Sequence, residues 1–104
     1  METFFVRIYP TRTGFMALPT EAETATLRRH FTYWQSRLAD KHLILARPVP
    51  IDPGTFGIII LRADDRSVAE ALLQADPAMA EHVMSYEIFP LRLSLYEGAN
   101  SESR

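Results

Sequence analysis

The sequence predicts an α+β domain in which four antiparallel strands form one sheet and two helices cover one of its faces. Three observations lead to this prediction. Four short segments combine apolar and β-branched residues in the manner of strands, and two longer segments carry apolar residues at helical spacing. Turn residues separate these segments, giving the order βαββαβ. The length of 104 residues fits one domain with a modest core.

The first half of the chain contains a predicted strand and a predicted long helix. Residues 3–9 alternate in the manner of a strand, with Phe4, Val6 and Ile8 on one face. After a loop over residues 10–19, Thr20 and Glu23 form a capping box that starts a helix of roughly 20 residues. Its predicted buried stripe places His30 at the border and consists of Leu27, Phe31, Trp34 and Leu38.

The second and third strands are predicted at residues 43–46 and 56–61. Pro48 and Pro50 are expected to end regular pairing of the second strand, which places that end at a sheet edge. A turn is expected at residues 52–54. The third strand is almost continuously apolar, so we expect both of its faces to be covered. Gly57 within it predicts a bulge or a close approach of backbone or ligand.

The last third of the chain contains a predicted second helix and a fourth strand. Asp64 or Asp65 caps the helix, which runs to about residue 75, and its expected inward side chains are Val68, Ala69, Leu72 and Leu73. A short turn is expected at residues 78–80 and a long strand at residues 83–96. Residues 1–97 then form the domain, and residues 98–104 form a flexible tail.

This element order is that of a ferredoxin-like fold. Two helices cover only one face of a four-stranded sheet, yet the strands carry apolar residues on both faces. We therefore expect a homodimer in which two sheets pack face to face, which gives a dimeric α/β barrel.

Composition excludes several classes of function. The net charge of −2 gives no reason to expect nucleic acid as a partner. The absence of cysteine excludes disulfides and thiolate chemistry. No apolar segment has the length of a membrane span, and no glycine-rich phosphate loop is present. We expect a soluble cytoplasmic protein that acts on a small molecule, without a membrane partner and without a cofactor.

A set of short motifs lies in a recognisable order along this chain. His30 lies on the first helix, Arg47-Pro48 ends the second strand, Asp76-Pro77 follows the second helix, and a strand closes with Tyr86-Glu87-Ile88-Phe89-Pro90. Over residues 3–96 this pattern resembles the YCII-related (YciI-like) family of dimeric α/β-barrel proteins. The resemblance implies a cleft with a histidine–aspartate dyad, His30 and Asp76. Lys41, Arg47 and His82 stand where that family often has glycine, and the last two are expected either to narrow the cleft or to make it favour an anion.

Each candidate site residue has a functional and a structural interpretation. His30 is either a general acid–base oriented by Asp76 or a boundary histidine bonded to backbone or water. Asp76 is either that orienting group or a local cap before Pro77. Arg47 binds a substrate carboxylate or is simply exposed. Trp34 stacks on a planar substrate or belongs to the core.

His82 is either an exposed residue or a second histidine of the pocket. In the latter case it completes a possible metal site of two histidines and one carboxylate with His30 and Asp76, although no compact ligand spacing supports it.

Three functions follow from these alternatives. The first is a cofactor-free lyase or isomerase that moves a proton on a small, anionic organic substrate, with His30 and Asp76 as its dyad. The second is a non-catalytic dimeric module that binds a small metabolite or serves as an accessory subunit. The third is a cofactor-independent monooxygenase-like protein, which only analogy of fold suggests.

Overall fold

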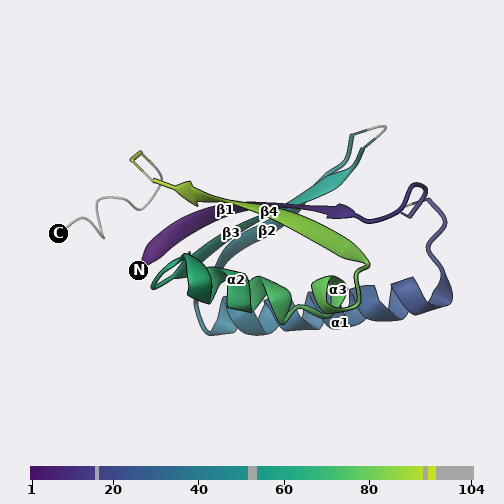
Figure 1. Cartoon of the computed structure of the whole chain (residues 1–104), viewed down its shortest axis with the longest axis horizontal. Helices are drawn as coiled ribbons and strands as arrows, with labels where there is room; N and C mark the ends of the chain where they lie inside the picture. Colours follow the sequence, from purple (N-terminus) through teal and green to yellow (C-terminus); the bar gives the residue numbers. More distant parts are fainter. Residues whose placement is uncertain (16, 52–53, 93, 96–104) are drawn as a thin grey trace.

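Four antiparallel strands form a sheet with three helices against one of its faces (Figure 1). In chain order the elements are β1 (Glu2–Pro10), α1 (Glu21–Ala39), β2 (Leu43–Val49), β3 (Phe56–Ala63), α2 (Arg66–Gln74), α3 (Pro77–Ala80) and β4 (Met84–Leu91). The computed structural model describes residues 1–15, 17–51, 54–92 and 94–95. The strand order β2-β3-β1-β4 confirms the predicted ferredoxin-like architecture.

Register separates the residues of the sheet into two faces. Val6 aligns with Ile59 and Ile88, and these three side chains are buried beneath the helices. The next position, Phe5, aligns with Ile60 and Phe89 on the opposite face. In Figure 1 all three helices lie on the same side of the sheet, so no helix or strand among the described residues covers the face of Phe5. We call it the open face.

Helix α1 begins as predicted but buries a different side. The Thr20 side chain accepts a hydrogen bond from the Glu23 backbone, and the Glu23 carboxylate accepts one from the Thr20 backbone, which confirms the capping box. The predicted stripe is wrong at Phe31 and Leu38, which are 65% and 56% exposed.

The buried face of α1 instead follows Thr26, His30 and Trp34, at i, i+4 and i+8. This shift arises because α1 packs on α3 as well as on the sheet. Polar partners on α3 draw these side chains inward, which an apolar pattern alone does not reveal.

The two edge strands depart from their predicted lengths in opposite directions. β2 extends to Val49, because Pro48 pairs opposite Gly57 and an edge strand can direct a missing N–H outward. β4 ends at Leu91, and residues 92, 94 and 95 are not in a strand, contrary to the predicted strand to residue 96. Leu91 pairs with Thr3 near the start of β1, so β4 runs out of partner there. Residues 93 and 96, the predicted tail and most of the predicted 52–54 turn lie outside the described residues.

The region around α2 and α3 shows two further differences. Asp65 caps α2 as one of the two predicted candidates, but Val68 is exposed while Ala69 and Leu73 face the core four residues apart. The predicted turn at residues 78–80 is part of the one-turn helix α3, which Asp76 caps. Among the described residues, no helix is long and apolar enough to cross a membrane.

Among the described residues, two that are not glycine adopt left-handed backbone conformations. Lys41 follows α1 with φ of 72°, and His82 follows α3 with φ of 58°. The His82 and Val83 amides donate back to the carbonyls of Met79 and Ala78, which is the hydrogen-bond pattern of a helix end that favours glycine. The preference for glycine that the family resemblance implies at positions 41 and 82 is therefore explained by the backbone conformation. At position 82 it does not reflect a need for space in a cleft.

We predict that His82→Gly stabilises the protein. Relief of the left-handed strain is worth about 1 kcal/mol, or roughly 4 to 8 °C in Tm for a domain of this size. Thermal unfolding followed by circular dichroism measures the change. His82→Ala is the control, because alanine keeps the Cβ atom. Equal Tm values for the two variants would contradict the backbone explanation.

Candidate functional site

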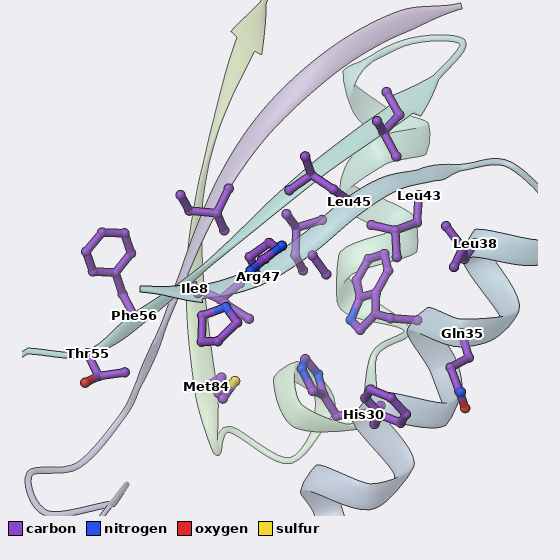
Figure 2. A pocket seen from close by; sticks show the side chains of 18 of the residues that line it. Ile8, His30, Gln35, Leu38, Leu43, Leu45, Arg47, Thr55, Phe56 and Met84 are labelled. Atoms are coloured by element: carbon purple, nitrogen blue, oxygen red, sulfur yellow. The ribbon is translucent and has the colours of Figure 1, made fainter. Parts of the chain in front are cut away.

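A cavity of about 560 Å³ lies between α1 and the β2 side of the sheet. This size falls in the range of small-molecule sites. Most of the lining is apolar, and its polar groups come from His30, Gln35, Arg47 and Thr55. Figure 2 shows side chains of α1 on one side of this space and side chains of the strands on the other. We call this space the α1–β2 cavity.

Gly57 on β3 forms part of the wall of the α1–β2 cavity. A Cβ atom at this position would lie 2.8 Å from Cγ1 of Ile8, closer than side chains pack. The glycine therefore permits the Ile8 side chain to cross over β3 at the cavity wall, whereas the prediction was a bulge or a close approach of backbone or ligand.

His30 lines the cavity and is hydrogen-bonded to Asp76. The Nδ1 atom of His30 lies 2.7 Å from Oδ2 of Asp76, although the two residues are 46 positions apart in the chain. The His30 side chain is 18% exposed, whereas the Asp76 side chain is fully buried. The structure thus brings together the two residues that the sequence singled out. An ionised carboxylate only accepts hydrogen bonds, so in the ionised form of Asp76 this contact requires a proton on Nδ1.

The Asp76 carboxylate is satisfied by three donors. Besides His30, Oδ2 accepts from Nε1 of Trp34 at 2.8 Å, and Oδ1 accepts from the backbone N–H of Ala78 at 2.9 Å. The last contact makes Asp76 the N-cap of α3, so both of its predicted interpretations hold geometrically. A buried carboxylate with this many donors keeps a fixed direction.

Trp34 belongs both to the core and to the cavity wall. It is 4% exposed, and its ring packs edge-to-face on Tyr33 with centroids 5.0 Å apart. It also lines the α1–β2 cavity. The position of Trp34, four residues after His30, places both side chains on one face of α1, above the same carboxylate.

A second contact between α1 and α3 lies at the other end of α3. Arg29 donates two hydrogen bonds to the carboxylate of Glu81, and the Thr26 hydroxyl donates a third at 2.7 Å. Glu81 is the C-cap residue of α3. The hydrogen bonds from Arg29, followed by the one from Thr26, lower the pKa of Glu81 to about 2. Helix α1 therefore holds α3 at both ends through carboxylates.

Of Arg47 and His82, only Arg47 borders the α1–β2 cavity. Arg47 is exposed on edge strand β2 and lines the cavity, as expected. His82 is exposed and borders a separate hollow with Met79 and Tyr86. This agrees with its interpretation as an exposed residue. The alternative place in the pocket of His30 is wrong, because the left-handed turn after α3 directs the side chain elsewhere.

The metal site predicted as an alternative is not formed by these three residues. His82 does not share the cavity of His30 and Asp76. Within the described ranges, no three histidine, aspartate or glutamate side chains lie close enough to hold a metal ion together.

Comparison with known proteins identifies the family. The model of the YCII-related domain matches residues 3–92. The chain belongs to the YCII-related domain family. No curated protein matches this YCII-related chain.

Solved structures share the fold of this YCII-related domain. It is similar to 5-chloro-2-hydroxyhydroquinone dehydrochlorinase (TftG) from Burkholderia phenoliruptrix AC1100, in complex with 2,5-dihydroxybenzoquinone. That match has a TM-score of 0.64 and 13% identity, and it covers 88% of this chain and 95% of the other.

A second similar structure is a mutant of SnoaB, a cofactor-independent oxygenase from Streptomyces nogalater. Its TM-score is 0.51 at 16% identity, and the match covers 92% of this chain and 98% of the other.

Sequence reasoning missed the hydrogen bonds that surround His30 and Asp76 in this YCII-related domain. The hydrogen bond from Trp34 to Asp76 could have been inferred from the i, i+4 spacing of His30 and Trp34. The Arg29–Glu81 contact could not have been inferred, because a surface arginine and a distant glutamate form no local sequence pattern.

We predict that the contact between Arg29 and Glu81 makes stability depend on pH below 4.5. Folding lowers the pKa of the Glu81 carboxylate from 4.5 to about 2. The carboxylate therefore stabilises the fold at pH values above 4.5, its pKa in the unfolded chain, and this contribution is lost as the pH falls towards 2. Urea unfolding at pH 6 and pH 3 should therefore show a larger loss of stability in the wild type than in Glu81→Gln. Glu21→Gln controls for the loss of a surface carboxylate. An unchanged pH dependence in Glu81→Gln would contradict this.

Proposed function

We propose that this protein is a cofactor-free enzyme of the lyase or isomerase type, in which His30 transfers a proton to or from a small organic molecule in the α1–β2 cavity. One observation carries the proposal. The imidazole of His30 lines an open cavity while a fully buried carboxylate accepts a hydrogen bond from its Nδ1 atom. Asp76 is the orienting partner in this proposal.

The hydrogen bond to Asp76 defines how His30 would act. With the proton on Nδ1, a neutral imidazole has its lone pair on Nε2, and Nε2 is the nitrogen left for a guest in the cavity. His30 would first act as a base through Nε2. The resulting imidazolium would be stabilised by the Asp76 carboxylate and would return the proton as an acid.

The chemistry of the cavity suggests the kind of substrate. Apolar and aromatic side chains, among them Phe31, Trp34 and Phe56, dominate the lining. Such walls favour a small molecule with an extended apolar or planar part. Arg47 borders the same cavity and would attract an anionic group. We therefore propose a small, planar, anionic organic substrate.

The named activities of the structural neighbours support proton chemistry on this fold. Dehydrochlorination removes a proton together with chloride, and the proton half of that reaction requires a base. TftG carries that name, and SnoaB is named as a cofactor-independent oxygenase. Both names describe enzymes, which supports an enzymatic role for this chain over a purely structural one.

A non-catalytic metabolite-binding module is the second candidate. The small number of polar groups in the cavity favours it, because binding of an apolar guest needs no proton transfer. The same cavity would serve both functions, so only a comparison of binding with turnover separates them.

We predict that His30→Ala abolishes turnover but leaves binding largely intact. Substituted hydroquinones, their chlorinated forms and 2,5-dihydroxybenzoquinone are the probes. Their binding is measurable by quenching of Trp34, the single tryptophan of the chain. Loss of a general acid–base should lower the rate by about 10²- to 10⁴-fold. Absorbance changes and chloride release measure this rate.

His82→Ala is the matched control, since it removes an exposed histidine outside the cavity. Equal turnover by His30→Ala and the wild type would contradict the catalytic proposal. Binding of probes without turnover by the wild type would favour the metabolite-binding module.

We further propose that two copies pair through their open faces. A row of apolar side chains crosses this face in register, consisting of Leu45, Ile60, Phe5 and Phe89. Leu45 and Phe89 are 40% and 45% exposed, and the Phe5 and Phe89 rings lie 6.1 Å apart. An exposed row of apolar side chains that crosses all four strands of a sheet is typical of a protein–protein interface. Leu45 also lines the α1–β2 cavity, so the proposed interface would reach the border of the cavity, whereas His30 lies on α1, on the helix side of the sheet.

Sedimentation velocity tests this pairing. We expect a species of about 24 kDa at micromolar concentration, twice the 11.9 kDa of one chain. Phe89→Glu should give a folded monomer, because it buries a charge in the proposed interface. Phe31→Glu, which alters an exposed phenylalanine on α1, should stay dimeric. A wild-type monomer across the micromolar range would contradict the proposal.

A further inference from the structure

Trp34 and His30 donate to the same oxygen atom of Asp76. The Nε1–Oδ2 distance is 2.8 Å and the Nδ1–Oδ2 distance is 2.7 Å. We infer that Trp34 is a positioning residue, whose indole N–H directs Asp76 Oδ2 at His30 and thereby keeps the proton of His30 on Nδ1. The inference rests on the proposed function, because the fixed proton position matters only if Nε2 acts as the base.

The three donors fix the carboxylate in complementary ways. The backbone N–H of Ala78 holds Oδ1, and the indole N–H of Trp34 holds Oδ2. Rotation of the carboxylate would break both hydrogen bonds in a fully buried site, where no water replaces them at low cost. Oδ2 therefore points at His30 before any guest enters the cavity.

Trp34 is better suited than His30 to hold the Asp76 carboxylate in a fixed orientation. The indole is 4% exposed and is held edge-to-face by Tyr33, whereas the His30 side chain is 18% exposed at the cavity. An imidazole that must gain and release protons needs a partner that stays fixed. A buried indole N–H is a donor that never ionises, so it holds Oδ2 in both charge states of His30.

A merely structural role for Trp34 predicts a different result. In that case the N–H only satisfies a buried aromatic residue, and its loss lowers stability without changing His30. Tyr33→Phe provides the matched control. Its hydroxyl donates to the Leu72 carbonyl at 2.5 Å, so this variant also removes one donor from a neighbouring aromatic residue but leaves Asp76 untouched.

The test is the ¹⁵N spectrum of the His30 ring in the full chain above pH 8, where a neutral imidazole reports its tautomer. We expect only the Nδ1–H form in the wild type and in Tyr33→Phe. Trp34→Phe keeps an aromatic ring in the cavity wall but loses the donor, and we expect a mixture of the two tautomers. The same tautomer in Trp34→Phe and Tyr33→Phe would overturn the inference.

A reciprocal measurement does not require Trp34→Phe to fold. The single tryptophan gives one indole N–H signal in a ¹H–¹⁵N spectrum. His30→Ala makes Trp34 the sole remaining side-chain donor to Oδ2 among the described residues, so this signal should shift, whereas His82→Ala should leave it in place. An unmoved signal in His30→Ala would also overturn the inference. Both spectra are recorded without substrate, so the inference fails or stands independently of turnover.

Discussion

The buried carboxylate of Asp76 is the constraint on which the arrangement of the helices depends. Removing a charged group from water is unfavourable unless donors replace the lost hydration. Here the donors come from the ring of His30, the indole of Trp34 and the backbone of α3. Each donor belongs to a helix whose position is thereby fixed relative to the carboxylate. One buried group thus links helix packing to the geometry of the candidate site.

The same constraint explains why α1 turns a partly polar face inward. Thr26, His30 and Trp34 follow one line on the helix, and each donates to a carboxylate at an end of α3. Burying this line leaves Phe31 and Leu38 outside the core, where they border the α1–β2 cavity. The apolar residues displaced from the core therefore contribute to the cavity wall, so the polar contacts of α1 and the apolar character of the cavity have one common cause.

The sequence predicted the parts of the fold that depend on local physics. Capping at Thr20 and Asp65 was readable, because a cap involves residues three positions apart. The strand order followed from the element pattern, and the juxtaposition of His30 and Asp76 followed from the family resemblance. The buried face of α1 and the end of β4 were not predicted, and the exposed place of His82 was only one of two alternatives. The first two depend on partners distant in sequence, namely the carboxylates of α3 and the first residues of β1. The pattern of apolar residues along the chain carries no information about such contacts. The place of His82 depends on the left-handed backbone directly after α3.

The wall of the cavity depends on the register of the sheet. Gly57 lies between Ile8 on β1 and Pro48 on β2, on the face that the helices cover. Two residues further along β3, the same face has Ile59, which is buried in the core. The sheet surface thus changes from a large side chain to none within one repeat of the strand, and the Ile8 side chain crosses β3 in the space that Gly57 leaves next to the edge strand. Pro48, which lacks an N–H, also makes that edge a poor partner for a further strand. Edge and cavity are therefore linked: Gly57 admits the Ile8 side chain to the cavity wall, Pro48 protects the border of the sheet, and His30 on α1 lines the same cavity.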